Sequence, residues 1–242
     1  MTTTATTIQY VVMLGVAALA FTGSFCRKRL KISLFTGSLV LLVVFCFFTY
    51  QQQSAGAIFA IFPLLAMCLT PLLGNFIDRK GKSLSLLILG SLLLIVCHLV
   101  FAFVVPSMDG GGSSFVVSYL AILVLGASFA LVPTAVWPLI PRLVDARILG
   151  TAYAFIYWAQ SVGLWLFPII VGKVLAQTNT QVREQVDSGA ISADQGSMMY
   201  DYTAPLVLFA SLGVGALVLS LILKTRNSRH HLGLDAPTVG TL

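Results

Sequence analysis

One short segment of this chain combines acidic, basic and glycine residues in an order that could do chemistry: Gly74-Asn75-Phe76-Ile77-Asp78-Arg79-Lys80-Gly81-Lys82. Asp78 can accept hydrogen bonds from the N-terminus of an adjacent helix, where the helix dipole is positive, or pair with an arginine. Gly74 permits a close helix contact, and Gly81 permits a tight turn. The order of these residues indicates a specific contact between helices, and the alternative is an ordinary short basic hairpin.

A second set of polar groups lies on the apolar run 149–175. At 100° per residue, one face of a helix there carries Gly150, Tyr153, Tyr157, Gln160 and Ser161. Such a face avoids lipid, and its hydroxyl and amide groups can hydrogen-bond a peptide-like solute. Helix–helix hydrogen bonding explains the same pattern, and the sequence leaves both interpretations open.

Trp137 lies near the end of another apolar run, 115–140, where Pro133, Pro138 and Pro141 predict a bent or broken helix end. Broken helices often line ligand paths inside membranes. Trp137 is therefore a candidate for solute contact, although an anchoring role at the membrane interface explains it equally well.

His98 is the sole ionisable residue deep inside an apolar run, which makes it a candidate proton relay. A neutral histidine bound to a backbone carbonyl is the plainer interpretation. No apolar run contains an Asp or Glu. The sequence therefore predicts no metal site and no cofactor, and it argues against an enzyme, which would need clustered reactive side chains.

The amino-acid composition indicates whether these residues lie in a membrane or in water. The chain is 58% hydrophobic and 9% charged, with a mean hydropathy of +0.97, whereas soluble domains carry about 25% charged residues. We expect an all-α, polytopic membrane bundle of about seven transmembrane helices, because each apolar run approaches the roughly 20 residues that span a bilayer. The runs are 8–26, 32–50, 54–76, 84–105, 115–140, 149–175 and 203–223.

The basic residues alternate with these runs in a way that predicts orientation. Strict alternation of seven helices puts nearly all loop Lys and Arg on one side, which the positive-inside rule makes cytosolic. The C-terminus is then also cytosolic. The net charge of +6 thus reflects topology, and we expect no nucleic-acid partner.

The segment 74–82 resembles the motif that transporters of the major facilitator superfamily carry between helices 2 and 3 and again between helices 8 and 9. Four apolar runs follow the segment, so the chain resembles the C-terminal six-helix bundle of such a transporter plus one extra N-terminal helix. The resemblance implies an N-terminal two-helix segment at 1–53, near helices 6 and 7. It places helices 8 to 12 at 54–225 and leaves a disordered cytosolic tail at 226–242.

A narrower resemblance points to the lysosomal dipeptide transporter group and its bacterial relatives. It rests on Ala57-Ile58-Phe59-Ala60-Ile61-Phe62-Pro63, Thr70-Pro71-Leu72-Leu73-Gly74, Trp137-Pro138 and Leu149-Gly150-Thr151-Ala152-Tyr153. It implies alternating-access transport of dipeptides or similar small organic solutes across a lipid bilayer, with a bacterial inner membrane favoured over a lysosomal one. A homodimer or a missing N-terminal half would complete the cavity. The alternative is a truncated, non-transporting fragment or interaction subunit.

The resemblance also implies a conformational latch, made by Gly74, Asp78, Arg79, Gly81 and Lys82. Its partner would be the helix start at Gly150, together with Arg142 or Arg147.

The latch predicts a change in conformation when its carboxylate is neutralised. In a full-length relative, we expect Asp78→Asn to alter transport and the solvent accessibility of the two sides, because the amide keeps the shape but loses the charge. Cysteine-accessibility labelling and uptake measure both. Unchanged uptake and unchanged accessibility would rule out the latch.

Overall fold

The computed structural model describes residues 55–108 and 112–237, together with scattered positions between 11 and 44. The two predicted runs 8–26 and 32–50, and the segment 1–53 that contains them, therefore lie largely outside the described residues. The account below concerns the part of the chain from residue 55 onwards.

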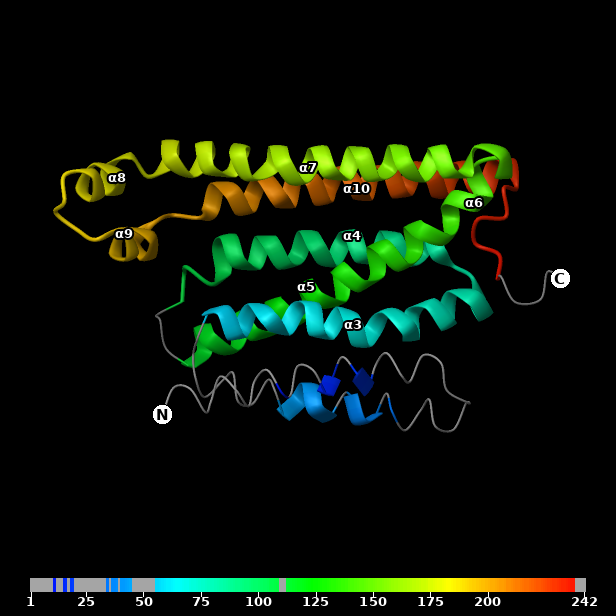
Figure 1. Ribbon diagram of the computed structural model, residues 1–242, viewed down its shortest axis with the longest axis horizontal. Helices are drawn as coiled ribbons and strands as arrows, with labels where there is room; N and C mark the ends of the chain where they lie inside the picture. Colours follow the sequence, from blue (N-terminus) through cyan, green and yellow to red (C-terminus); the bar gives the residue numbers. More distant parts are fainter. Residues whose placement is uncertain are drawn as a thin grey trace.

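Five long helices run side by side through this part of the chain (Figure 1). They are α3 (Ala55–Lys80), α4 (Ser83–Leu99), α5 (Gly112–Val136), α7 (Leu149–Thr178) and α10 (Thr203–His230). A π-helical turn, Val100–Val104, continues α4. Each of the five stretches is long and apolar enough to cross a membrane, and every regular element among the described residues is helical. The prediction of an all-α membrane bundle is confirmed.

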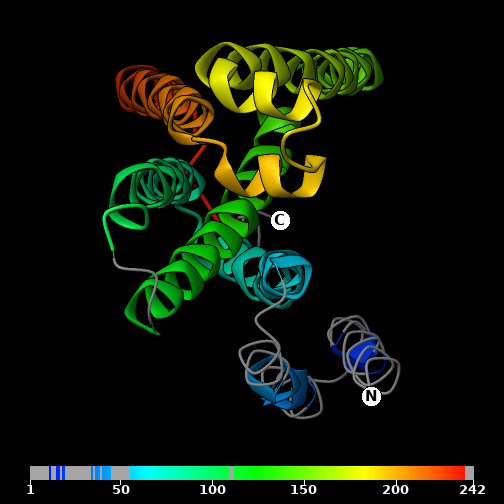
Figure 2. The ribbon, with the colours of Figure 1, turned by 90° about the vertical axis from the view of Figure 1, so that its left-hand side faces the viewer.

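The core of the bundle forms where α5 runs diagonally between α3 and α4 (Figure 2). Gly126 of α5 meets α3 so closely that an added Cβ would lie 2.8 Å from the Phe62 carbonyl oxygen. Gly90 of α4 meets α5 in the same way, with Leu131 Cβ at 3.0 Å. The Ser128 hydroxyl crosses this second contact and donates to the Gly90 carbonyl oxygen at 2.8 Å. Small residues thus let the helix backbones approach.

Two other long helices differ in how firmly they join this core. α10 packs along α4, where a Cβ on Gly213 would lie 2.8 Å from Ile95 Cγ1. Lys224 Nζ of α10 also donates to Ser85 Oγ of α4 at 3.1 Å. α7 is peripheral: its main contacts are with α10 and with the short segments just before it, and none of its residues is buried.

The prolines at the end of α5 act as the sequence predicts. α5 ends at Val136, and a 3-10 turn, Trp137–Leu139, leads into the short helix α6 (Ile140–Leu143). A second 3-10 turn, Ala146–Ile148, precedes α7, and its cap Asp145 accepts a hydrogen bond from the Arg147 backbone N–H at 3.0 Å. The break turns the chain so that α7 starts at the same end of the bundle where α5 finished (Figure 1).

Two polar segments are more ordered than the sequence predicts. The polar segment 176–202, which lies between the last two apolar runs, holds α8 (Thr180–Asp187) and α9 (Ala193–Met199). Ser192 and Gln195 form a capping box that starts α9. At the C-terminus, α10 continues to His230 and residues up to 237 pack against the bundle. The expectation of a disordered tail from residue 226 is corrected as far as Pro237.

The α3–α5 contact predicts a sharp difference between two glycines. We expect Gly126→Ala to destabilise the bundle by about 1–3 kcal/mol, because the new methyl group forces the two backbones apart. Gly215→Ala on α10 is the matched control, since a Cβ there meets nothing within 4 Å. Unfolding midpoints in lipid nanodiscs measure both, and equal midpoints would show that the close approach contributes nothing to stability.

Candidate functional site

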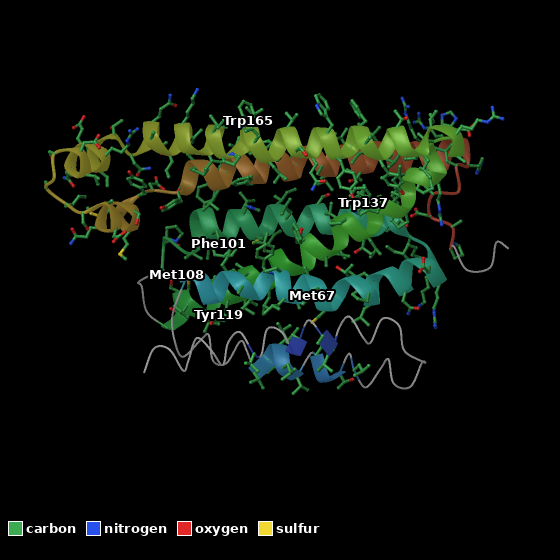
Figure 3. All side chains as sticks on the ribbon, in the orientation of Figure 1. Met67, Phe101, Met108, Tyr119, Trp137 and Trp165 are labelled. Carbon is green, nitrogen blue, oxygen red and sulfur yellow. The ribbon has the colours of Figure 1, made fainter. Side chains whose placement is uncertain are left out.

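The candidate site is the side of α7 that carries Tyr153, Tyr157 and Gln160, which we call the α7 face. Trp137, from the turn after α5, packs against its first two residues. The Trp137 ring lies 5.8 Å from the Tyr153 ring at an interplanar angle of 28°, and 5.2 Å from the Tyr157 ring. Figure 3 shows Trp137 on the inner side of α7, whereas Trp165 points outward. The structure thus brings Trp137 onto two tyrosines that the sequence had placed together on one helix face.

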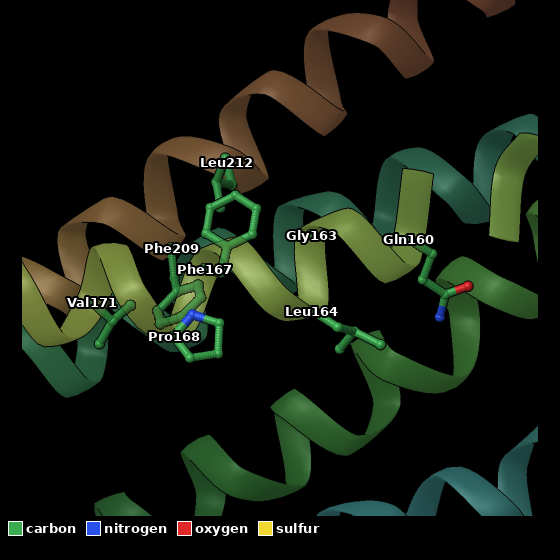
Figure 4. A pocket seen from close by; sticks show the side chains of 8 residues that line it. All are labelled: Gln160, Gly163, Leu164, Phe167, Pro168, Val171, Phe209 and Leu212. Atoms are coloured by element: carbon green, nitrogen blue, oxygen red, sulfur yellow. The ribbon is translucent and has the colours of Figure 1, made fainter. Parts of the chain in front are cut away.

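A cavity of about 480 Å³ continues the α7 face toward the far end of the helix. Gln160 lies at one end of it and Val171 at the other, and α10 closes one side with Phe209 and Leu212 (Figure 4). The remaining lining residues are Gly163, Leu164, Phe167 and Pro168. Gln160 is the one lining residue with a polar side chain, so the cavity is apolar with an amide at its edge.

This arrangement suits a small solute that has both polar and apolar parts. The Gln160 amide can donate and accept hydrogen bonds, and the nearby tyrosine hydroxyls can do the same. The cavity beyond can bury an apolar group, because pockets of this kind are mostly apolar with a few orienting polar groups. Ser161, also predicted for this site, is exposed and does not line the cavity.

Phe209 and Leu212 were missed by sequence reasoning because they lie on another helix. A weak signal was present: Phe209 is the single Phe, Tyr or Trp residue in α10. Helical periodicity within one segment cannot show which neighbouring helix it meets, so the α10 wall of the cavity could not be derived from it.

The segment 74–82 takes the predicted turn but not the predicted contacts. Gly81 has a positive φ of 70°, as a tight turn requires. Gly74, expected in a close helix contact, has no heavy atom within 4 Å of where its Cβ would lie, because it faces open space on α3. Asp78 is exposed and makes no hydrogen bond or ion pair with any described residue. Arg79 and Lys82 are exposed as well.

The predicted latch partners are engaged elsewhere or exposed. Arg147 contributes its backbone N–H to Asp145, and Gly150 is exposed with open space around it. Arg142 reaches the C-terminal tail, where its Nη1 donates to the carbonyl oxygens of Gly233, Leu234 and Ala236 at 3.2, 3.1 and 2.8 Å. In this structure the latch contact between Asp78 and these partners is not formed, and the latch stays a prediction for another conformation.

The acid that caps a helix at this end of the bundle is Asp235 of the tail. Its Oδ1 accepts from the Leu84 backbone N–H at 2.8 Å, and its carbonyl oxygen accepts from the Lys82 N–H at 3.0 Å. A carboxylate is stabilised there by the positive end of the α4 dipole. In this structure the helix that receives such a cap is α4, and the acid that supplies it is Asp235.

His98 lies between α4 and α10, where its Nδ1 is 2.8 Å from the Leu94 carbonyl oxygen and its ring is 5.6 Å from Phe209. Since a carbonyl only accepts, Nδ1 carries the proton in this contact. The plainer interpretation of His98 as a carbonyl-bound neutral histidine fits these contacts, and a proton-relay role stays a prediction. Within the described residues, no group of three or more His, Cys, Asp or Glu could hold a metal ion.

At the far end of α7, buried Asn179 joins the helix to the start of α10. Its Nδ2 donates to the carbonyl oxygens of Leu175 and Asp201, and its Oδ1 accepts from the Asp201 N–H at 2.7 Å. Asp201 in turn accepts from the Thr203 N–H at 2.8 Å, and its hydrogen bonds with Thr203 lower the pKa of its carboxyl group. Asn179 and Asp201 thus hold the far end of α7 against the start of α10.

Comparison with known proteins supports the resemblance seen in the sequence. The chain is 30% identical over 128 residues to the lysosomal dipeptide transporter MFSD1 of Mus musculus. The aligned residues make up 53% of this chain and 25% of the relative. The same transporter from Homo sapiens is 28% identical and that from Gallus gallus 27% identical, each over 128 residues. The chain thus spans about a quarter of the length of the curated relatives it matches.

No family model matches the chain, and no solved structure matches it significantly. Over the matched 128 residues, the chain nevertheless resembles relatives that are named as lysosomal dipeptide transporters. Together with the five apolar helices, they support a multi-pass membrane protein.

The aromatic contact on the α7 face predicts unequal roles for two tryptophans. We expect Trp137→Ala to lower stability by about 2–4 kcal/mol, because Tyr153 and Tyr157 lose the ring they pack on. Trp165→Ala on α7 is the control, since Trp165 is 68% exposed. Thermal unfolding in nanodiscs, followed by circular dichroism, compares the two. A similar loss in both variants would mean that Trp137 does not hold α7.

Proposed function

We propose that this chain forms all or part of a secondary active or facilitative transporter that moves dipeptides or similar small organic solutes by alternating access. The observation that carries the proposal is the α7 face, where two tyrosines and a glutamine lead into an apolar cavity. A dipeptide presents amide groups next to side chains, and the α7 face offers amide and hydroxyl groups next to an apolar space. The name of the relatives supports the same solute class.

The absence of buried residues on α7 supports a second partner for this face. Gln160 and Tyr157 are exposed within the chain, and polar groups in a membrane interior face protein or water rather than lipid. We infer that another helix bundle covers the α7 face in the working transporter, either from a second copy of this chain or from an N-terminal bundle. Solutes bind between such bundles near the middle of the membrane.

The distribution of charge supports an orientation. Arg79, Lys82, Arg142 and Lys224 lie at one end of the bundle, which we call the basic end. By the positive-inside rule we infer that the basic end, and with it the C-terminus, faces the cytosol. A bacterial inner membrane is the proposed location, with a lysosomal membrane as the alternative.

Uptake of a radiolabelled dipeptide into proteoliposomes that contain the purified chain tests this function. We expect Gln160→Leu to weaken dipeptide binding by roughly ten- to a hundredfold, because losing a desolvated hydrogen bond to the solute costs about 1–3 kcal/mol. Gln177→Leu makes the same substitution on α7, away from the cavity lining, and should leave binding unchanged.

The outcomes separate the function from the site. Uptake that Gln160→Leu does not affect would support transport but contradict binding at the α7 face. Binding without uptake would support the site and show that a second bundle must be supplied. If neither binding nor uptake occurs, the alternative of a non-transporting segment or interaction subunit is favoured.

A further inference from the structure

Residues 231–237 form an ordered strap across the basic end of the bundle. Leu234, which is fully buried, inserts among Leu84 of α4, Leu139 of the turn after α5, and half-buried Leu223 of α10. The Leu234 N–H donates to Asn227 Oδ1 at 2.9 Å, which returns the chain from the end of α10 onto the bundle. One apolar side chain thus joins three elements that are distant in the sequence.

Polar contacts on both sides of Leu234 fix the strap. Asp235 caps α4 through the Leu84 N–H, and Arg142 of α6 binds the carbonyl oxygens of three strap residues, as described above. Gly81 is required for the strap to dock in this position, because a Cβ on it would collide with the Asp235 carbonyl oxygen. The glycine of the 74–82 segment therefore does more than permit a turn: it leaves room for the strap.

The residue that the strap binds lies close in sequence to the start of α7. Only residues 143–148 separate Arg142, which the strap binds, from the first residue of α7. None of α7 is buried, so packing restrains it weakly between its ends. At the opposite end, α7 is tied to α10 through Asn179 and Asp201. The helix is thus held at two ends by polar contacts and loosely between them.

We propose that the strap is a conformational restraint on α7: while 231–237 is docked, Arg142 fixes the basic end of α7, and when the strap leaves, that end swings about Asn179. The Trp137 contact with Tyr153 and Tyr157 then remains as the second, weaker restraint. This device goes beyond the proposed transport and does not depend on it.

Two measurements on the full chain in lipid nanodiscs test the restraint. The first is hydrogen exchange at the Lys82 and Leu84 amides, which donate to Asp235. The second is the distance distribution between spin labels on unnatural amino acids, with one pair at Phe155 and Leu219 in the basic half and one pair at Lys173 and Val207 in the other half. Labels of this kind avoid the four native cysteines.

The strap offers a matched pair of variants. Leu234→Ala removes the buried side chain, whereas Leu232→Ala removes a leucine that is 46% exposed in the same strap. Asp235→Ala removes the cap independently. We expect Leu234→Ala and Asp235→Ala to speed exchange at Lys82 and Leu84 about tenfold, since each releases amides from charge-assisted or buried contacts. The Phe155–Leu219 distribution should broaden toward longer distances, the Lys173–Val207 distribution should stay unchanged, and Leu232→Ala should change neither.

Three results would overturn the proposal. Unchanged exchange at Lys82 and Leu84 in Asp235→Ala would show that the strap does not protect α4. Faster exchange with an unchanged Phe155–Leu219 distribution would show that the strap docks without restraining α7. Equal broadening of both label pairs would indicate general loosening of the bundle, without a pivot at Asn179. A single cooperative thermal unfolding transition confirms that each variant is folded, even where its midpoint is lower than that of the parent chain.

Discussion

Close backbone approach in lipid is the constraint on which the rest of this structure depends. Helices in a bilayer gain little from burying apolar side chains against each other, because lipid tails are equally apolar, so packing and interhelical hydrogen bonds must hold them. Gly126 and Gly90 bring α3 and α4 against α5, and the Ser128 hydroxyl bonds across the second contact. Gly213 then brings α10 against α4. These four helices form one closely packed unit because each contact has a small residue where the backbones meet.

α7 lacks such a contact, and its properties follow from that absence within the described chain. A Cβ on Gly150 or Gly172 would meet nothing within 4 Å, so the small residues of α7 mark no close approach here. Besides the ring contact with Trp137, α7 is held by polar contacts near its two ends. Arg142 binds the strap near its start, and Asn179 binds Asp201 at its end. The same helix carries the tyrosines, the glutamine and the cavity. Polar side chains that are open to a ligand cannot also be packed against neighbouring helices. The helix that carries the candidate site is therefore also the most weakly packed of the five long helices in the described part of the chain.

The sequence predicted the elements well and their contacts poorly, for a physical reason. Apolar length defines a membrane helix almost by itself, so the runs 84–105, 149–175 and 203–223 match α4 with its π turn, α7 and the membrane-spanning part of α10. Prolines likewise located the break after Val136. Which acid meets which helix end depends on tertiary position, and Asp78 and Asp235 both lie near the basic end. Polarity made residues 226–237 look disordered, yet a single buried leucine and one carboxylate fix this segment in place.

The position of Asp235 changes the structural role of the 74–82 segment in this chain. Gly81 and the turn it forms pack against Asp235 of the tail. The segment's own acid, Asp78, does not cap a helix in this structure. Asp78 is left exposed beside basic side chains, and Arg142 is bound to the backbone of the strap. An arginine that binds neutral carbonyls keeps its full charge, whereas a carboxylate partner would neutralise it. Exchange of Arg142 from the strap to Asp78 would trade several hydrogen bonds to neutral carbonyls for one ion pair. A latch between Arg142 and Asp78 therefore stays a prediction, and in this structure the strap occupies the arginine.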